Sequence, residues 1–544
     1  MNPNANIGRH LGDRARARPQ GAALRVPRGR TPGGDIDYLS LTFAELDAEV
    51  GAWAGRLAAR GIGRGDRTLI MVRPGLPLIA SVFALFRIGA VPVVIDPGMR
   101  LSSFLECVRR TQPRALVGLP LAQLISRVLR RDFRSVAIRV PASSSLVARI
   151  GPGGPAIADS AIAHCAAGDP AAILFTSGST GSPKGVRYDH GMFEAQVRLI
   201  RDTYEIAPGE VDLPLLPVFA LFNPALGMTT VVPELDPRRP AAADPAAIVQ
   251  AIRQEKVTNS FGSPTLWRII FDHCRARGIT LPGLRRVLCA GAPVPASVWS
   301  DAPVFLPNGR LHSPYGATEA LPVSSISNPD LRSTGGAPVG RPLSGISVKI
   351  IALSDEPIAA LGDARELPDG DIGEIIVSGP VVSREYDSLP EATRRAKIRG
   401  PGGEVWHRMG DCGFRDAAGA LWFCGRAAER VETPSGTMHT EPCERVFRAH
   451  PRAARCALIG LGPRGNQVPA IVAEARAAGA ADAAALAAEL GALAAAHPQT
   501  SAITRFYFNP RFPMDVRHNA KIHRLALARW AAAATAHETG GPAP

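Results

Sequence analysis

The residues best suited to chemistry lie between Ile173 and Tyr188, a stretch that reads ILFTSGSTGSPKGVRY. Apolar residues at its start predict the end of a buried strand, and a loop rich in hydroxyls and glycines follows. Because glycine adopts positive φ at little cost, successive N–H groups in such a loop can turn inward and surround an anion. We therefore predict that the loop binds the phosphates of a nucleotide. Its binding residues are Thr176, Ser177, Gly178, Ser179, Thr180, Gly181 and, as a mobile positive charge, Lys184.

Two other interpretations of this loop explain its residues less well. A Walker A loop needs Gly directly before its Lys and Ser or Thr directly after it, whereas Pro183 precedes and Gly185 follows Lys184. A plain Ser/Gly-rich surface loop explains flexibility, but it does not explain five hydroxyls spaced among three glycines beside a lysine. The segment TSGSTGSPKG resembles the phosphate loop of the adenylate-forming superfamily, which includes acyl-CoA synthetases, luciferases and the adenylation domains of peptide synthetases.

The segment SPYGATEA (313–320) is a second strong motif. Thr318 can donate a hydrogen bond to a phosphate, and Glu319 can hold Mg²⁺, a cation that prefers carboxylate and phosphate oxygens. We expect Tyr315, with Gly316 beside it, to lie against adenine. An isolated tyrosine and glutamate are more often structural, but YGATE downstream of the phosphate loop favours a nucleotide site.

A third signal comes from Asp411 in RMGDCG and Arg426 in CGRAAERV. A carboxylate can accept hydrogen bonds from both ribose hydroxyls, and Arg426 resembles the superfamily arginine whose planar fork helps to hold ribose and phosphate. The alternative for both is a surface ion pair.

The segment LRRVLCAGAPVP (284–295) resembles the strand and turn that precede the adenine site of the superfamily. The resemblance implies that backbone is exposed there against the base, at Gly291, Ala292 and Pro293. An ordinary turn at the end of a strand is the alternative.

Lys521 in MDVRHNAKIHR is a fourth signal, in a chain that has five lysines and 57 arginines. In the superfamily a lysine near the C-terminus bridges the carboxylate and the α-phosphate in the transition state, where negative charge develops. The resemblance thus implies that Lys521 is catalytic together with Thr318 and Glu319. In the implied reaction a carboxylate attacks the α-phosphorus of MgATP, pyrophosphate leaves and an acyl-adenylate forms, with no protein nucleophile.

The fate of the acyl-adenylate depends on residues that depart from the acyl-CoA ligases. Those ligases carry a His near VFALFNP and an Asp or Lys after the Gly-Arg pair, whereas this chain has Phe219, Phe222 and Ala427. The segments PVFALFNPALGM, YGATEALPV and FPMDVRHNAKIHR are similar to those of the OleC-type β-lactone synthetases of bacterial olefin biosynthesis. An apolar acyl pocket is expected at Phe219, Phe222 and Met228, with core packing as the equal alternative.

That narrower resemblance implies a long-chain 2-alkyl-3-hydroxy acid as substrate, whose own hydroxyl closes a β-lactone without CoA. It also implies association with the other enzymes of olefin biosynthesis. The runner-up is a medium- or long-chain fatty acyl-CoA ligase. A basic protein that binds nucleic acid is the alternative from another class, but the positive charges are scattered and not clustered.

Helix and strand patterns must position these motifs. A helix is expected after Ser40 and then strand, helix and strand from RTLIMV to VPVVID, an alternation that predicts an α/β layer with a parallel sheet. The predicted fold is α/β, with a large N-terminal domain of parallel-sheet subdomains plus a small β subdomain, and a smaller mobile α+β C-terminal domain. The predicted units are a partly ordered lead-in (1–36), the ATP- and acyl-binding domain (37–425), a hinge (426–433), the C-terminal domain with the catalytic lysine (434–533) and a disordered tail (534–544).

Composition sets further bounds. The net charge of +14 is interpreted as an arginine-rich solvated surface. The eight cysteines form no CxxC pair, which argues against zinc and a disulfide framework and favours a reducing cytoplasm. The start of the chain lacks the apolar core of a signal peptide. The apolar segment Leu76 to Phe86 is too short to span a bilayer and is expected to be a buried helix.

Overall fold

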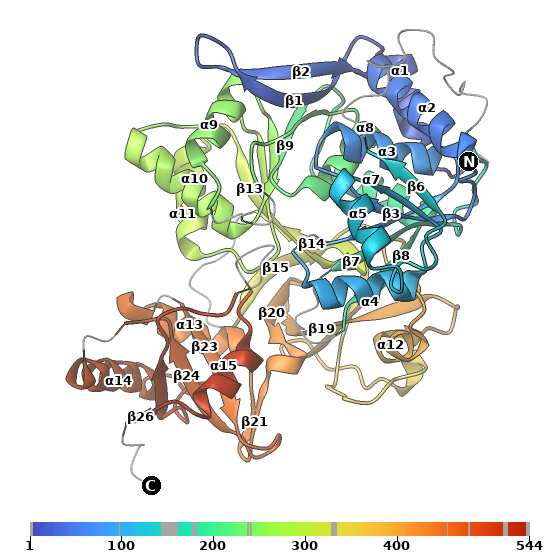
Figure 1. Cartoon of the computed structure of the whole chain (residues 1–544). Helices are drawn as coiled ribbons and strands as arrows, with labels where there is room; N and C mark the ends of the chain where they lie inside the picture. Colours follow the sequence, from blue (N-terminus) through green and yellow to red (C-terminus); the bar gives the residue numbers. More distant parts are fainter. Residues whose placement is uncertain are drawn as a thin grey trace.

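The computed structural model describes residues 4–96, 98–142, 162–176, 182–236, 239, 242–327, 335–453, 455–476, 479–514 and 521–539. A large N-terminal part carries two sheets, and a smaller unit formed by the last hundred or so residues lies below it (Figure 1, orange to red). Among the described helices, none combines the length and the apolar character needed to cross a bilayer.

A six-stranded sheet in the order β6-β5-β3-β4-β7-β8 confirms the predicted parallel α/β layer. Its strands are parallel except for the last pair, β7 and β8. The strands are β3 (Arg67–Met71), β4 (Val91–Ile95), β5 (Ala115–Gly118), β6 (Ile138–Pro141), β7 (Pro170–Thr176) and β8 (Lys184–Asp189). The helices that precede, connect or follow them are α2 (Phe43–Ala59), α3 (Leu76–Arg87), α4 (Leu101–Thr111), α5 (Pro120–Val128) and α7 (His190–Thr203). The phosphate loop therefore joins β7 to β8.

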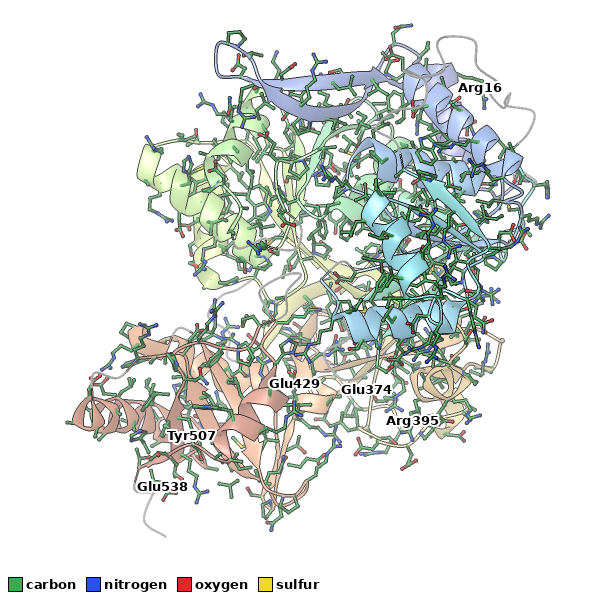
Figure 2. All side chains as sticks on the ribbon, in the orientation of Figure 1. Arg16, Glu374, Arg395, Glu429, Tyr507 and Glu538 are labelled. Carbon is green, nitrogen blue, oxygen red and sulfur yellow. The ribbon has the colours of Figure 1, made fainter. Side chains whose placement is uncertain are left out.

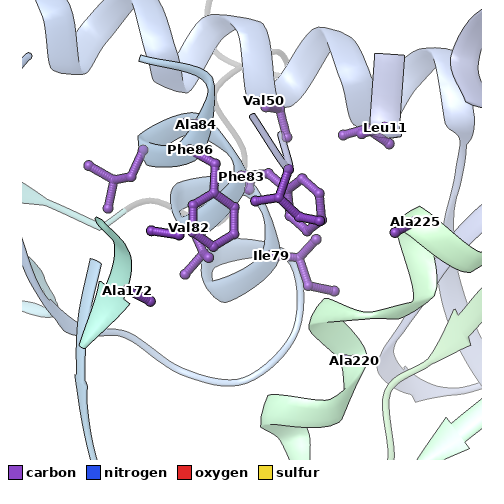
Figure 3. Close-up of a cluster of buried hydrophobic side chains, with 14 of the residues drawn as sticks. Leu11, Val50, Ile79, Val82, Phe83, Ala84, Phe86, Ala172, Ala220 and Ala225 are labelled. Carbon is purple, nitrogen blue, oxygen red and sulfur yellow. The ribbon is translucent and has the colours of Figure 1, made fainter. Parts of the chain in front are cut away.

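Helix α3 confirms the buried helix predicted for Leu76 to Phe86, because ten of its twelve residues are buried. Its Ile79, Phe83 and Phe86 pack into a core together with Val50 and Leu11 (Figure 3). The preceding helix, α2, begins after Thr42. The side chain of Thr42 accepts a hydrogen bond from the Glu45 amide in a capping box, an arrangement that fixes the start of the helix.

A 14-stranded sheet runs through the rest of the N-terminal part in the order β16-β17-β19-β20-β15-β14-β13-β12-β11-β9-β10-β1-β2, with β18 paired to β19. From β10 to β13 the strands are parallel, and from β13 to β16 they are antiparallel, which forms the predicted small β subdomain. The strands are β1 (Ala22–Arg30), β2 (Ile36–Thr42), β9 (Val211–Pro214), β10 (Thr229–Val231), β11 (Asn259–Gly262), β12 (Arg286–Cys289), β13 (Arg310–Ala317), β14 (Ala320–Ile326), β15 (Ala337–Pro342), β16 (Ser347–Ile351), β17 (Gly373–Ser378), β18 (Lys397–Arg399), β19 (Val405–Arg415) and β20 (Leu421–Arg426).

Helices α9 (Pro245–Gln254), α10 (Pro264–Arg277) and α11 (Ala296–Phe305) gather beside this sheet (Figure 1, green). Three short helical segments matter for the site or for the connection to the C-terminal unit: η2 (Pro217–Leu221), α8 (Asn223–Leu226) and η5 (Ala427–Glu429). A further short helix, α12 (Pro390–Ala396), leads into β18.

The C-terminal unit holds a strand, an Ala-rich helix, a second strand and a final helix. They are β23 (Cys456–Leu461), α14 (Ala480–Ala495), β25 (Arg505–Phe508) and α15 (Arg524–Ala531). Its further elements are β21 (Val431–Thr433), β22 (Gly436–Met438), α13 (Thr440–Arg448), β24 (Val468–Ala473) and β26 (His537–Glu538). Strand β24 pairs with both β23 and β25.

Two predictions about the chain ends need correction. The segment 1–36 is more than a partly ordered lead-in, since α1 (Arg9–Ala17) and β1 belong to the folded part and Leu11 and Leu24 are fully buried. Strand β1 is ordered because it pairs with two other strands. One is β2, which follows it directly, and the other is β10, which lies far away in sequence. Within the predicted disordered tail, β26 pairs with β25, while residues 540–544 lie outside the described part.

Candidate active site

Most of the predicted site residues in the described part of the chain line one large cavity. Its volume is about 2970 Å³, and it reaches from the six-stranded sheet to the C-terminal unit. The predicted residues that line it are Lys184, Phe219, Phe222, Gly291, Ala292, Pro293, Tyr315, Gly316, Thr318, Glu319, Asp411, Arg426 and Lys521. Thr176 ends β7 opposite Lys184, and residues 177–181 of the phosphate loop lie outside the described part. Four motifs that are far apart in sequence thus meet around one space.

Asp411 is held from both sides. The antiparallel register of β19 and β20 places it opposite Arg426, whose Nη1 donates to Asp411 Oδ1 at 2.7 Å. The hydroxyl of Tyr315 donates to Oδ2, also at 2.7 Å. The negative charge of Asp411 raises the pKa of Arg426, so the guanidinium group stays charged. A carboxylate offers about four acceptor positions, which leaves a position on each oxygen of Asp411 for a ligand hydroxyl.

The predicted adenine loop follows β12. Gly291 has a φ of 100°, a backbone conformation that residues with a Cβ atom rarely adopt. Gly291 and Ala292 are half-buried and line the cavity, as does the exposed Pro293. The loop therefore exposes backbone to the cavity, as a flat aromatic base requires.

Thr318 and Glu319 form the tip of the tight connection between β13 and β14. The Tyr188 hydroxyl donates to the Thr318 carbonyl at 2.5 Å, and the Ser383 amide donates to the Glu319 carbonyl at 2.8 Å. The Tyr386 hydroxyl donates to Glu319 Oε1 at 2.7 Å. Both backbone and side chain of Glu319 are therefore fixed before any ligand binds.

Lys184 approaches the same place from β8. Its Nζ lies 5.1 Å from the centre of the Tyr386 ring, in the range of a cation–π contact. Lys184 is exposed and lines the cavity, so its charge is available to a phosphate.

Lys521 reaches the cavity from the C-terminal unit, three residues before α15. Arg524 at the start of α15 donates to Glu444 at 2.6 and 2.7 Å and to Glu429 at 3.0 Å. Glu429 ends η5, the turn that directly follows Arg426, and lies where the two parts of the molecule meet (Figure 2). The Arg524 ion pairs therefore connect the Lys521 segment to the turn that follows β20, the strand that carries Arg426.

The predicted acyl wall divides into two parts. Phe219 stacks on Phe261 with ring centres 3.7 Å apart, and Phe222 lies edge-on to Phe193 at 6.3 Å. Phe219 and Phe222 line the large cavity, but Met228 does not. Met228 lines a separate cavity of about 50 Å³ that the two phenylalanines also border. The phenylalanines therefore separate Met228 from the main site.

Comparison with known proteins assigns this arrangement to a family. The family model of the AMP-binding enzymes matches residues 13–387, which is more than half of the chain. The chain belongs to the AMP-binding enzyme family. Its predicted membership of the adenylate-forming superfamily is thereby confirmed.

Individual relatives cover nearly the whole length of this AMP-binding enzyme. It is 45% identical to the olefin β-lactone synthetase of Xanthomonas campestris pv. campestris, over 98% of both chains. It is 43% identical to the olefin β-lactone synthetase of Stenotrophomonas maltophilia, over 98% of this chain and 99% of the relative. In fold it resembles ATP-bound MatB from Rhodopseudomonas palustris, with a TM-score of 0.78 and 21% identity over 97% and 99% of the two chains. The predicted α/β fold with a smaller C-terminal domain is confirmed.

The sequence did not predict the residues that lie behind Glu319 in this AMP-binding enzyme. Lys397 is buried, its Nζ donates to Ser383 Oγ at 3.0 Å, and it lies 5.8 Å from the centre of the Tyr386 ring. Burial lowers the pKa of Lys397 to about 7, against the opposing charge of Glu319. Burial and then the charge of Lys397 lower the pKa of His407 well below its usual range. The scarcity of lysine was the one signal that could have pointed to Lys397.

The buried amine leads to a prediction about stability and pH. Between pH 7 and the ordinary lysine pKa of about 10.4, the unfolded chain holds a proton at Lys397 that the folded AMP-binding enzyme lacks. The free energy of unfolding should therefore rise with pH in this range, by roughly 1.4 kcal/mol per pH unit, and become flat below pH 7. Denaturant unfolding at pH 7 and pH 9 measures the free energy of unfolding of the wild type and of Lys397→Met, and only the wild type should show this rise.

Lys349→Met is the matched control, because Lys349 forms a partly exposed ion pair with Glu366. The difference in the free energy of unfolding between Lys349→Met and the wild type should change little over the same pH range. An equal pH dependence for wild type and Lys397→Met would show that Lys397 remains protonated in the folded protein.

Proposed function

We propose that this enzyme adenylates a long-chain 2-alkyl-3-hydroxy acid and converts the acyl-adenylate to a β-lactone, with release of AMP and pyrophosphate. The observation that carries the proposal is the full-length similarity to two olefin β-lactone synthetases, at 45% and 43% identity. The cavity, which brings the predicted nucleotide residues together with an aromatic wall, supports it.

In the first half-reaction the protein positions the reactants and neutralises charge. Asp411 is suited to hold the ribose hydroxyls, while Lys184 and Thr318 are suited to contact the phosphates. Lys521, which lines the cavity, would bring its charge to the α-phosphate. An oxygen of the substrate carboxylate forms a bond to the α-phosphorus, and the bond from the α-phosphorus to the pyrophosphate oxygen breaks.

Glu319 fits the predicted contact with Mg²⁺. Its Oε1 accepts from Tyr386, and none of the donors in the described part of the chain bonds its Oε2. No group of three or more His, Cys, Asp or Glu side chains suited to a metal occurs among the described residues. This fits an ion that is held by one carboxylate and by the phosphates of the nucleotide. When bound, Mg²⁺ would neutralise phosphate charge.

Tyr386→Phe is expected to weaken the contact between Glu319 and Mg²⁺ without abolishing it. The variant keeps the ring that Lys184 and Lys397 approach, but it loses the hydroxyl that holds Glu319 Oε1. Loss of one hydrogen bond to a charged group corresponds to roughly a tenfold higher Mg²⁺ concentration for half-maximal adenylation. Pyrophosphate release measured over a Mg²⁺ titration gives this value, and an unchanged Mg²⁺ requirement would contradict the role of Tyr386.

In the second half-reaction the β-hydroxyl oxygen attacks the activated carbonyl carbon. The bond from that carbon to the phosphate oxygen breaks, AMP leaves with the electron pair, and the hydroxyl proton is released. An intramolecular hydroxyl has a very high effective concentration, so the enzyme needs no second substrate for this step. We accordingly propose that CoA is not required.

The proposal extends to the setting of the reaction. All eight cysteines are free thiols, as is usual in a reducing compartment that also supplies ATP, which supports a cytoplasmic location. Association with other enzymes of olefin biosynthesis is part of the proposal, because a lipid-like lactone favours direct transfer to the enzyme that consumes it.

Turnover without CoA tests the proposal. The enzyme would receive MgATP and either a 2-alkyl-3-hydroxy acid or the same acid without its hydroxyl. AMP should accumulate over many turnovers with the first acid. With the second acid, pyrophosphate release should stop after about one turnover per site and no AMP should be released, because the trapped adenylate keeps its AMP. AMP release that requires CoA with both acids would establish an acyl-CoA ligase instead.

A further inference from the structure

Exposed apolar side chains gather at one edge of the large cavity. Of the nine large apolar side chains that are exposed in the described part of the chain, four lie on α4 and α5. They are Leu101 (61% exposed), Leu121 (65%), Leu124 (56%) and Val128 (70%), and we call this group the α4–α5 rim. The other five are distributed over β2, α11, β24 and α15.

Helix α5 presents this apolar group as a continuous outer face. Leu121, Leu124 and Val128 are spaced by three and four residues, so they lie on one side of the helix. The opposite side, with Ala122, Gln123 and Ser126, is buried against the sheet. Outward positions of a surface helix are normally polar, so an apolar outer side indicates that this side meets an apolar surface.

The rim is also an entrance to the cavity. Leu101 and Leu121 are exposed to solvent and line the cavity at the same time, and Phe104, Ala122 and Ile125 continue the lining inward. Helices α4 and α5 both lie in front of the six-stranded sheet in Figure 1 (blue and cyan). An apolar path therefore leads from the rim toward the site where the acid would react.

Positive charge surrounds the rim. The segment 98–142 contains nine arginines and only two acidic residues, Glu106 and Asp132. Both acids are already paired, Glu106 with Arg110 and Asp132 with Arg109. Arg100, Arg127, Arg130, Arg131 and Arg134 are exposed and have no acidic partner among the described residues. After burial, the charges of Arg127 and Arg130 lower the pKa of Arg139, a sign of the crowded positive charge.

We propose that the α4–α5 rim docks on an anionic lipid bilayer and that the long-chain acid enters the cavity there. The apolar outer face of α5 inserts among the acyl chains, and the flanking arginines meet the anionic headgroups. A protein partner would equally cover an apolar face, but it would not account for an apolar opening that leads from that face into the cavity. The docking surface is thus a property of the chain beyond its proposed reaction.

Vesicle flotation tests the docking. The full-length enzyme is mixed with vesicles of phosphatidylglycerol and phosphatidylethanolamine, or of phosphatidylcholine alone, at low and high salt. The wild type should float with the anionic vesicles at low salt and much less at high salt or with phosphatidylcholine. Leu124→Ser/Val128→Ser should lower the bound fraction about tenfold, and Arg127→Gln/Arg130→Gln/Arg131→Gln should remove the preference for anionic vesicles.

Val304→Ser/Val468→Ser is the matched control, because these two exposed valines lie on α11 and β24, away from the rim. It should float like the wild type. Leu124 and Val128 do not line the cavity, so Leu124→Ser/Val128→Ser should turn over a short, water-soluble β-hydroxy acid normally. That activity shows that the variant is folded. The same variant should be slow with an acid presented in anionic vesicles.

Equal flotation of the wild type and the Leu124→Ser/Val128→Ser variant would overturn the proposal. So would a wild type that ignores vesicles but forms an oligomer that this variant loses, since the rim would then be a protein interface. Flotation needs neither ATP nor a particular acid, so its failure would leave the proposed reaction intact.

Discussion

Lys521→Ala is expected to slow acyl-adenylate formation by roughly 10²–10³-fold, the usual cost of removing one preorganised charge from a transition state. Lys521 lines the cavity from the C-terminal unit, and its segment is joined to the turn after β20 through Arg524 and Glu429. Because the lysine acts on charge that develops during the reaction, ATP binding should remain within a few-fold of the wild type. Acid-dependent ATP–pyrophosphate exchange measures the rate, and equilibrium dialysis measures ATP binding.

Two comparisons sharpen this experiment. Lys256→Ala removes another of the five lysines at an exposed position outside the cavity, and it should leave the exchange rate unchanged. A synthetic acyl-adenylate supplied to Lys521→Ala should still close to the lactone, since that step no longer involves pyrophosphate departure. Exchange at the wild-type rate in Lys521→Ala would remove Lys521 from the catalytic residues.

Glu319→Gln is expected to produce the second large loss, about 10²-fold in the rate of adenylation at a fixed Mg²⁺ concentration. The amide oxygen of Gln can still accept from the Tyr386 hydroxyl, so the variant keeps the local structure and removes only the charge. The rate should recover in part at high Mg²⁺. Initial rates of pyrophosphate release across a Mg²⁺ series measure both effects.

Glu385→Gln provides the matched control for Glu319→Gln. Glu385 directly precedes Tyr386 and forms an ion pair with Arg187. It does not line the cavity. Its variant should retain the wild-type Mg²⁺ requirement. If Glu319→Gln also retained that requirement, the metal would be held elsewhere in the site.

The sequence predicted those parts of the site that are carried by short, contiguous motifs. Thr318 and Glu319 occupy one tight turn, and Asp411 faces Arg426 because two neighbouring strands bring positions fifteen residues apart into register. The strands and helices of the parallel layer could be predicted equally well, because periodic patterns of apolar residues within each segment indicate its secondary structure.

What the sequence did not predict depends on contacts between distant segments. The Tyr315 hydroxyl reaches Asp411 across 96 residues, and Tyr386 reaches Glu319 across 67. Lys397 acquires its low pKa only through tertiary burial, and no local pattern marks it. Met228 was grouped with Phe219 and Phe222 because it is close to them in sequence. In the structure the two phenylalanine rings lie between Met228 and the large cavity, and Met228 lines a separate small cavity. The order of β1 likewise comes from β10, some two hundred residues later.

The most direct test of the account follows oxygen atoms. A 2-alkyl-3-hydroxy acid labelled with ¹⁸O in both carboxylate oxygens would be incubated with the enzyme and MgATP in the absence of CoA. Mass spectrometry should find one ¹⁸O in the AMP and one in a neutral β-lactone, because the carboxylate gives one oxygen to phosphorus and the unlabelled hydroxyl closes the ring. A lactone that retains both labels beside unlabelled AMP would show that the hydroxyl is activated instead of the carboxylate. It would contradict the central claim.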